Sequence, residues 1–283
     1  MAFLALLPLR ALADRAVSHA PATAINQRVI AALPKWHGRS AEIVDHLDLT
    51  SPFGTQSQWT FVAALLPGSR ANVFSEIVHS GPLAICFVHD LKPQCSYPAA
   101  DKSTHPPWRE NLFHFYAAKV VFAGANHTDP LLLVTTGGAS GVNGNHPVYT
   151  HLFSYNRRIN GFQAAFHNMT YSNNNQETRF VEHGPLRGDV VSAVPTVTAP
   201  YAYWISVYAR NREGQYSDPV LRYRSATRYG DGNHLAVIDS EMPNILEHLD
   251  KWKPGDPLPI PHRLPSRCAH RLFLRGGEEW CPQ

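Results

Sequence analysis

Between about positions 56 and 225, short runs rich in Val, Phe, Tyr and Thr alternate with clusters of Gly, Pro, Asn and Asp. Short apolar and β-branched runs that are bounded by turn residues are typical of β-strands. The sequence predicts strands at Trp59–Leu65, Leu83–His89, Phe113–Phe122, Leu131–Thr136, Tyr149–Tyr155, Phe162–Phe166, Thr178–Glu182, Asp189–Val194, Tyr203–Arg210 and Pro219–Tyr223.

Several of these runs alternate in character. In residues 149–155, aromatic and histidine side chains fall on one face of the predicted strand, and Thr150, Leu152 and Ser154 fall on the other. No helical segment separates the runs, which argues against parallel βαβ units. The predicted fold class is therefore mainly β, with antiparallel sheets in a propeller-like or a sandwich arrangement.

A weak internal repeat bears on the choice between these two arrangements. The order strand, connection, aromatic strand and turn occurs in 132–166 and again in 190–223, and the equivalent turns begin at Asn156 and Asn211, 55 positions apart. A period near 50 is in the range of propeller blades. Consecutive hairpins of a sandwich would give similar spacing, so both arrangements stay open.

Helical spacing is confined to the two ends of the chain. Ala24–Leu33 places Ile25, Val29 and Leu33 on one face and ends before Pro34. Asn244–Trp252 has the same pattern and is followed by Pro and Gly. We therefore expect one short helix near each terminus.

The N-terminus resembles an export signal. Residues 2–9 are apolar, and Ala11 and Ala13 fit the A-x-A pattern before a cleavage site, so the mature chain would begin at Asp14. Arg10 lies after the apolar run, where a signal peptide rarely carries charge. The run is far shorter than the roughly 20 residues that span a bilayer, so no transmembrane segment is predicted.

These observations divide the chain into four parts. The predicted parts are a signal peptide at 1–13, a lead-in with a short helix at 14–50, a main β domain at 51–235, and a C-terminal helix with a Pro- and Arg-rich, disulfide-closed tail at 236–283.

Four cysteines suit an exported chain, and they allow three disulfide connectivities. The local pairs Cys86–Cys95 and Cys268–Cys281 are favoured, because each closes a short loop that contains proline. Neither pair has the C-x₂₋₄-C spacing of a zinc site. Oxidation of these thiols would place the protein in the periplasm or outside the cell.

The densest polar stretch lies at 173–184. Its amide, carboxylate, guanidinium and imidazole groups suit a hydroxyl-rich ligand, and Trp204 could stack on a sugar ring. The candidate ligand-binding residues are Asn175, Glu177, Arg179, Glu182, His183 and Trp204. Glu177 and Glu182 could form a carboxylate pair for glycoside hydrolysis, but five residues of strand would send them to opposite faces. A solvated hairpin with ordinary cross-strand pairs is the competing interpretation.

Sixteen histidines raise the question of a metal site. His146 and His151 could converge across the start of a strand, with His167 or His183 joining them through the sheet. Scattered surface histidines explain the number as well, and no H-E-x-x-H motif occurs. No metal and no cofactor are predicted.

The net charge of +3 is too small to indicate nucleic-acid binding by itself. Arg222-Tyr223-Arg224 and Arg228-Tyr229 interleave basic and aromatic residues, a pattern that can bind single strands. An exported protein rarely meets that ligand, and packing of Tyr against Arg stems is favoured instead. Nucleic acid is therefore not a predicted partner.

Two Asn-x-Thr motifs, Asn126-His127-Thr128 and Asn168-Met169-Thr170, would be glycosylation sequons in a eukaryotic host.

No catalytic or cofactor motif with its expected spacing occurs in the chain. The functional hypothesis is an exported, non-catalytic binding protein of the cell envelope or extracellular medium, with an envelope glycan or another anionic surface as partner. The alternative is a secreted hydrolase that acts on a glycan or ester around Glu177, Glu182 and His183.

Overall fold

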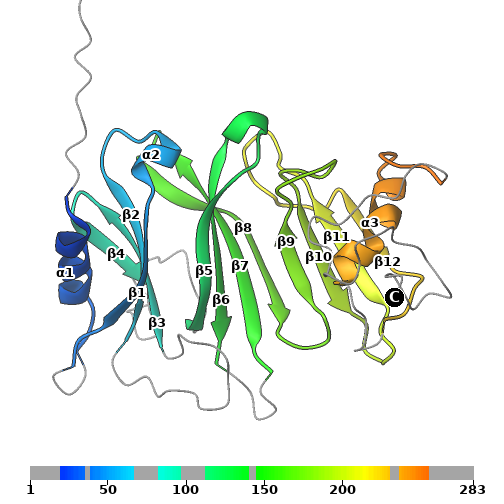
Figure 1. Cartoon of the computed structure of the whole chain (residues 1–283), viewed down its shortest axis with the longest axis horizontal. Coiled ribbons are helices and arrows are strands. Elements are labelled where there is room, and N and C mark those ends of the chain that lie inside the picture. The colour runs from blue at the N-terminus through cyan, green and yellow to red at the C-terminus, as the bar shows by residue number, and fades with distance from the viewer. Residues whose placement is uncertain are drawn as a thin grey trace, which may run out of the picture.

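The structure is a computed structural model, and it describes residues 20–35, 39–66, 82–96, 112–139, 145–229 and 236–254. These residues form twelve strands in three four-stranded antiparallel sheets, which confirms the mainly β, antiparallel prediction (Figure 1). The first sheet contains β1 (Glu42–Asp48), β2 (Trp59–Leu65), β3 (Leu83–His89) and β4 (Lys92–Ser96). The second contains β5 (Leu112–Phe122), β6 (Pro130–Gly138), β7 (Pro147–Asn156) and β8 (Gly161–Tyr171). The third contains β9 (Glu177–Phe180), β10 (Val190–Pro195), β11 (Tyr203–Tyr208) and β12 (Leu221–Arg224).

Each sheet is a meander whose strands pair in the order of the sequence, as in a propeller blade. The three sheets lie face to face in a row, with α1 (Ala22–Ala32) at one end and α3 (Val237–His248) at the other (Figure 1). Two short helical turns, α2 (Thr50–Phe53) and η1 (Ala125–His127), lie in connections. The repeated turns at Asn156 and Asn211 follow β7 and β11, the third strands of consecutive sheets, so the weak repeat corresponds to a repeated sheet.

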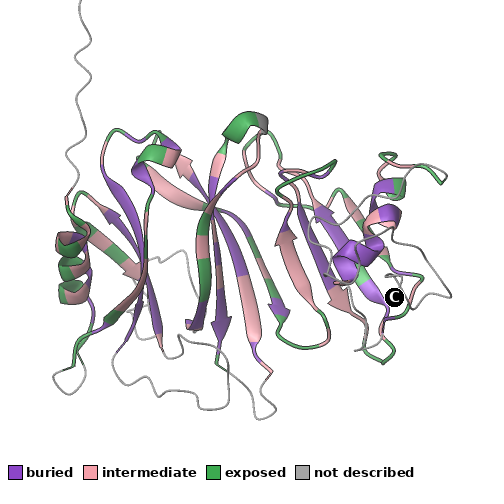
Figure 2. Cartoon of the chain, in the orientation of Figure 1, coloured by how far each residue is buried: buried purple, intermediate pink, exposed green. Residues whose placement is uncertain are grey.

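Apolar clusters join every pair of neighbouring layers. Ile25 and Val29 of α1 pack on the outer face of the first sheet, as the helical spacing predicts. Ile245 and Leu246 of α3 pack on the outer face of the third sheet. Figure 2 shows that most of α3 is buried, whereas α1 exposes its outer side. The outer faces of the first and third sheets are therefore both covered by helices.

The strand β2 is covered on both faces by neighbouring layers. All seven residues of β2 are buried, because Val62 and Ala64 face α1 while Phe61 and Ala63 face the second sheet. Strands that are buried on both faces read as continuous apolar runs, which is why the limits of this strand follow directly from the sequence.

Aromatic side chains fill the layer between the first two sheets. The ring centroid of Phe87 lies 5.3 Å from that of Phe153 and 5.1 Å from that of Phe162. The Phe162 ring also contacts Phe53 at 4.9 Å and Trp59 at 5.4 Å. Because large aromatic side chains bury much apolar surface, this cluster is a main source of cohesion between the two sheets.

The structure departs from the predicted elements at three places. Strands β1 and β4 were not predicted, because both are edge strands with polar residues or proline, and such edges lack a continuous apolar run. The C-terminal helix begins at Val237 rather than at Asn244, since Pro243 lies inside it. Proline normally interrupts a helix, so the sequence before Pro243 does not predict helix.

None of the helices in the described ranges is both long enough and apolar enough to cross a membrane.

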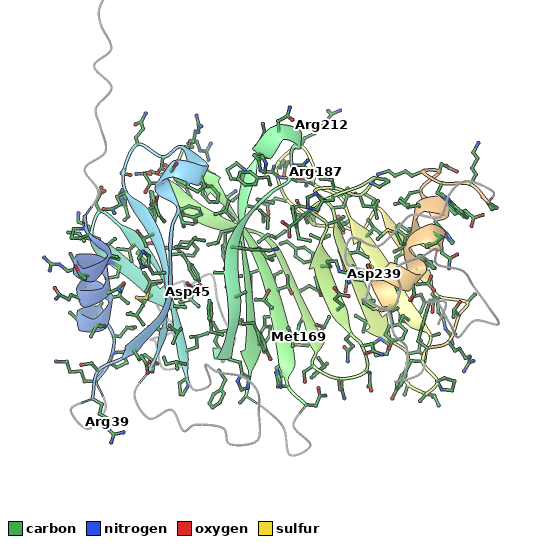
Figure 3. All side chains as sticks on the ribbon, in the orientation of Figure 1. Arg39, Asp45, Met169, Arg187, Arg212 and Asp239 are labelled. Carbon is green, nitrogen blue, oxygen red and sulfur yellow. A yellow bond between two sulfur atoms is a disulfide. The ribbon has the colours of Figure 1, made fainter. Side chains whose placement is uncertain are left out.

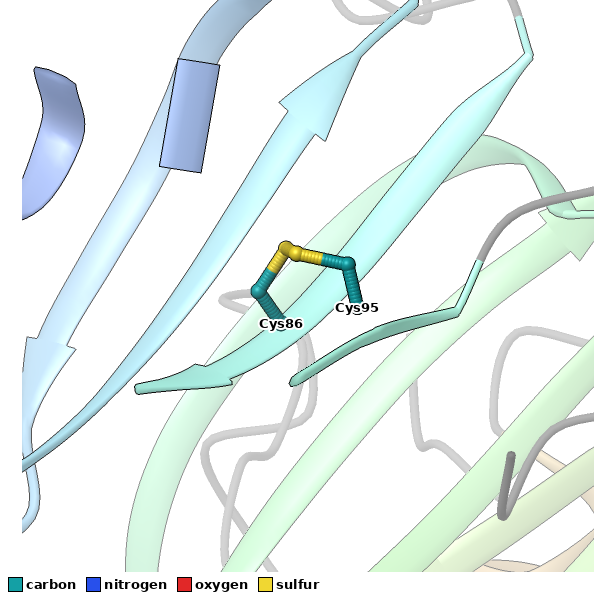
Figure 4. Close-up of a disulfide and its surroundings, with 2 residues drawn as sticks. All are labelled: Cys86 and Cys95. Atoms are coloured by element: carbon teal, nitrogen blue, oxygen red, sulfur yellow. A yellow bond between two sulfur atoms is a disulfide. The ribbon is translucent and has the colours of Figure 1, made fainter. Parts of the chain in front are cut away.

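The disulfide Cys86–Cys95 is present, which confirms one of the two predicted pairs (Figure 4). It joins directly opposed residues of β3 and β4, and Cys86 is fully buried against α1. The disulfide therefore ties an edge strand to the core. Cys268–Cys281 lies outside the described residues, as does the predicted signal peptide.

We expect the double substitution Cys86→Ala/Cys95→Ala to lower the free energy of unfolding by about 2–3 kcal/mol. The bond closes a loop with a sequence separation of 9, and its loss returns that loop's conformational entropy to the unfolded chain. Urea denaturation of the two proteins under non-reducing conditions measures the difference. An unchanged midpoint would show that the bond contributes nothing to stability.

Candidate functional site

The predicted ligand-binding residues are divided between the two faces of the third sheet. Glu177 and Arg179 pair with Ala193 and Val191, whose side chains pack under α3. Trp204 lies between Tyr203 and Ile205, which also face α3, so the alternation of the strand directs Trp204 to the opposite face. The sheet therefore does not bring Trp204 together with Glu177 and Arg179.

Arg179 joins β9 to α3 through two carboxylates. Its Nε and Nη2 donate to the two oxygens of Glu177 at 2.5 and 2.9 Å. Its Nη1 and Nη2 donate to Asp239 of α3, the second contact at 3.2 Å, and Asp239 is labelled on that helix in Figure 3. Burial opposes the charge of Arg179, but the hydrogen bonds and charges of Asp239 and Glu177 outweigh burial and raise the guanidinium pKa. We infer that this network holds the helix on the sheet.

A second buried network reinforces the same contact. Glu241 of α3 is completely buried and accepts hydrogen bonds from the hydroxyls of Tyr223 and Tyr229 and from Nδ2 of Asn244, the last at 3.1 Å. Burial, followed by the charge of Glu241, raises the pKa of both tyrosines, so both hydroxyls remain donors. Asp239 and Glu241 of α3 therefore help to attach the helix to the sheet.

The remaining predicted residues lie in turns at either end of β9. Asn175 is exposed before the strand, in the left-handed region at φ 49°. The strand ends at Phe180, so Glu182 and His183 lie beyond it and are exposed. Glu182 forms an ion pair with Lys119 of β5. The carboxylates of Glu177 and Glu182 thus have different partners, and the structure does not bring them together around one point.

The face of the third sheet that carries Trp204 turns towards the second sheet. The ring of Tyr208 lies 5.2 Å from that of Phe166 on β8, and Nδ2 of Asn168 donates to Oγ of Ser192 at 2.9 Å. Near the apolar end of this layer, Val190 and Phe180 pack against the second sheet. The layer becomes polar towards Trp204.

Three hydroxyl side chains form a row across this face of the third sheet. The row consists of Thr178 on β9, Ser192 on β10 and Ser206 on β11, which stand opposite one another, and Arg222 on β12 stands opposite Ser206. Asn168 reaches this row from β8, and its Nδ2 donates to Thr178 Oγ1 at 2.7 Å as well as to Ser192. No sequence pattern indicates this row, because β9, β10 and β11 each contribute only one small polar residue to it.

Trp204 and two arginines lie beside the hydroxyl row. Trp204 is 43% exposed, and the guanidinium carbon of Arg222 lies 5.4 Å from its ring centroid. Arg224 stands directly opposite Trp204 on the edge strand β12. Both arginines are exposed, and no carboxylate of the described residues forms an ion pair with either one. We call Trp204, Arg222 and Arg224 the arginine–tryptophan face.

Two histidines and one tyrosine form a group on the second sheet, on the side that faces the third. His114 of β5 and His146 have ring centroids 4.8 Å apart, and the hydroxyl of Tyr116 contacts Nε2 of His146. These three rings cover Gly137, where an added Cβ would lie 3.1–3.2 Å from each of them. Burial, followed by the charge of His146, lowers the pKa of His114 from 6.5 to about 4.

The histidines that were candidates for a shared metal site occupy different positions. His146 belongs to the group that covers Gly137. His151 and His167 stand opposite each other on β7 and β8, and their ring centroids are 4.6 Å apart. His151 shares a face with Phe153, which packs against the first sheet, and His183 lies beyond β9. Within the described ranges, no group of three or more His, Cys, Asp or Glu side chains could hold a metal ion.

No protein-family model matches the chain, and neither a search of curated proteins nor a search of solved structures finds a significant match.

Replacing Arg179 by Ala is expected to lower the free energy of unfolding by roughly 3 kcal/mol, because Asp239, only 11% exposed, and Glu177 would lose their counter-ion. Hydrogen exchange should accelerate first in α3. Lys119→Met is the matched control: its ion pair with Glu182 is exposed on both sides, so its loss should cost less than about 1 kcal/mol. Equal losses in urea denaturation would contradict the proposed role of Arg179.

The stability of the protein should fall as the pH is lowered from 6.5 towards 4. Because the pKa of His114 is depressed in the folded protein, the unfolded chain binds a proton in this window that the folded protein does not. His114→Gln should flatten the pH dependence of the unfolding midpoint, and His46→Gln, at an exposed position on β1, should not. A pH dependence that His114→Gln leaves unchanged would contradict this assignment.

Proposed function

We propose that the protein is an exported, non-catalytic binding protein that holds an acidic glycan on the arginine–tryptophan face. The observation that carries the proposal is an exposed indole ring flanked by two exposed arginines that have no carboxylate partner among the described residues. Large aromatic side chains and arginines are the residues that dominate recognition surfaces.

The chemistry of the three side chains indicates the class of ligand. A guanidinium group offers a planar set of N–H donors that matches a carboxylate or sulfate with two parallel hydrogen bonds. The flat indole ring suits the apolar face of a sugar. Arg222 and Arg224 are two residues apart on one face of β12, so their charges repel each other, and an anion placed between them would relieve that repulsion.

A binding function is favoured over hydrolysis by the position of the acidic residues. On the face of β9, β10, β11 and β12 that carries Trp204, no position is acidic. Glu177 lies on the other face with Arg179, and Glu182 pairs with Lys119. Hydrolysis of a glycoside needs two carboxyl groups on either side of one bond, and the described residues offer no such pair here.

The disulfide supports the export part of the proposal. Disulfides persist in oxidising compartments and are rare in the cytosol, and Cys86–Cys95 is formed in the folded protein. Acidic glycans are abundant at cell surfaces and in extracellular matrices, so the proposed compartment and the proposed ligand agree.

Binding should be measured by calorimetry with heparin fragments and oligogalacturonates as acidic probes and with cello-oligosaccharides as the neutral probe. We expect the acidic probes to bind, and their affinity to fall as the salt concentration rises. Arg222→Ala and Arg224→Ala should each weaken binding about tenfold, since a charge-assisted contact contributes roughly 1.5–3 kcal/mol. Trp204→Ala should lower the affinity for both acidic probes.

Two control variants test whether binding depends on the arginine–tryptophan face itself or on any exposed charge or aromatic ring. Arg212→Ala removes an exposed arginine in the connection between β11 and β12, at the upper edge of the sheets in Figure 3, and Tyr171→Ala removes an aromatic ring that is 42% exposed. Both should leave the affinity unchanged. Binding that is lost equally in the Arg212→Ala protein, or binding of anionic lipid vesicles in place of the glycans, would overturn the proposal.

A further inference from the structure

The two Asn-x-Thr motifs occupy very different environments. Asn126 lies in the connection between β5 and β6, and Asn168 lies inside β8. An oligosaccharide can remain attached only where the asparagine side chain and the space around it are open to solvent in the folded protein. The structure therefore distinguishes between two motifs that the sequence alone treats as equal.

Asn126 is at the tip of a closed turn. The backbone N–H groups of Ala123 and Gly124 donate to the carbonyls of Asp129 and Thr128 at 3.1 and 3.0 Å, which closes the turn at its base. Asn126 is exposed and has a φ of 55°, the left-handed conformation that Asn adopts more readily than most residues. Its side chain is therefore presented outwards on a short, well-defined turn.

Asn168 is held between two sheets. Its Nδ2 donates to Thr178 and to Ser192 of the third sheet at 2.7 and 2.9 Å, and Thr170, the third residue of its motif, is only 3% exposed. A sugar on this nitrogen would replace one of these hydrogen bonds and would have to fit within the layer between the second and third sheets. Attachment at Asn168 is incompatible with the packed structure.

We propose that Asn126 is an N-linked glycosylation site and that Asn168 is not occupied in the folded protein. The donor is a lipid-linked oligosaccharide diphosphate of a eukaryotic secretory pathway. The amide nitrogen of Asn126 forms a bond to C1 of the first sugar, the bond from C1 to the diphosphate oxygen breaks, and the nitrogen loses one proton as the lipid diphosphate leaves. The inference rests on the export that the proposed function includes.

The glycan at Asn126 would lie away from the arginine–tryptophan face. Gly188, which precedes β10, approaches the turn so closely that an added Cβ would lie 2.5 Å from the carbonyl oxygen of Ala123. Trp204 pairs with Val194 near the other end of β10. The glycan and the proposed ligand thus occupy opposite ends of the third sheet, and removal of the glycan should leave binding of heparin fragments unchanged.

The test is translation of the full chain in the presence of microsomes, once with its own N-terminus and once behind an added cleavable signal peptide. Peptide N-glycosidase treatment and peptide mass analysis should find one glycan and an Asn-to-Asp conversion at position 126 in the folded, protease-resistant fraction. Asn126→Gln and Thr128→Ala should abolish the glycan, and Thr128→Ser should retain it. Asn168→Gln should leave it in place.

The outcomes separate this inference from the export hypothesis. Modification only behind the added signal would support the site and contradict export by the chain's own N-terminus. An unmodified Asn126 in lumenal, folded protein would overturn the inference, as would a glycan on Asn168 in the protease-resistant fraction.

Discussion

The structure depends on burial of both faces of each sheet by the neighbouring layer. A single meander of four strands leaves an apolar face in water, and here each such face is covered by another sheet or by a helix. The aromatic contacts of Phe87, Phe153 and Phe162 join the first two sheets. Because this packing determines which side of every strand faces inwards, it also determines which polar side chains lie close enough to contact each other.

The third sheet shows how one constraint produces two different surfaces. On its outer face, Arg179 and Glu241 bring charges and hydrogen bonds together to hold α3. On its inner face, the hydroxyl groups that contact Asn168 of the second sheet are followed by Trp204 and two arginines towards the end of the third sheet. The charges on the outer face are satisfied within the protein, whereas the arginines beside Trp204 are not neutralised by any described carboxylate. This contrast, more than any sequence motif, indicates where a ligand would bind.

The sequence predicted those features that depend on neighbours along the chain. The apolar run of β2, the face of α1 and the pair Cys86–Cys95 all follow from local spacing. It did not predict contacts between elements: Arg179 and Asp239 are 60 residues apart, and nothing in their spacing links them. The sequence also does not separate Trp204 from Glu177. Alternation shows which residues of one strand share a face, but the order and register of the strands in the sheet are needed to relate the faces of β9 and β11.

We propose that the arginine–tryptophan face binds an acidic glycan, and the indole N–H of Trp204 is the group whose signal would report such binding most directly. We would record ¹⁵N-labelled tryptophan side-chain resonances while adding heparin fragments, with Trp204→Phe used to assign the resonance. We expect the Trp204 resonance to shift and the resonance of buried Trp59, whose Nε1 donates to Asn160, to stay in place. Binding of heparin fragments that leaves the Trp204 resonance unmoved would show that the ligand binds elsewhere.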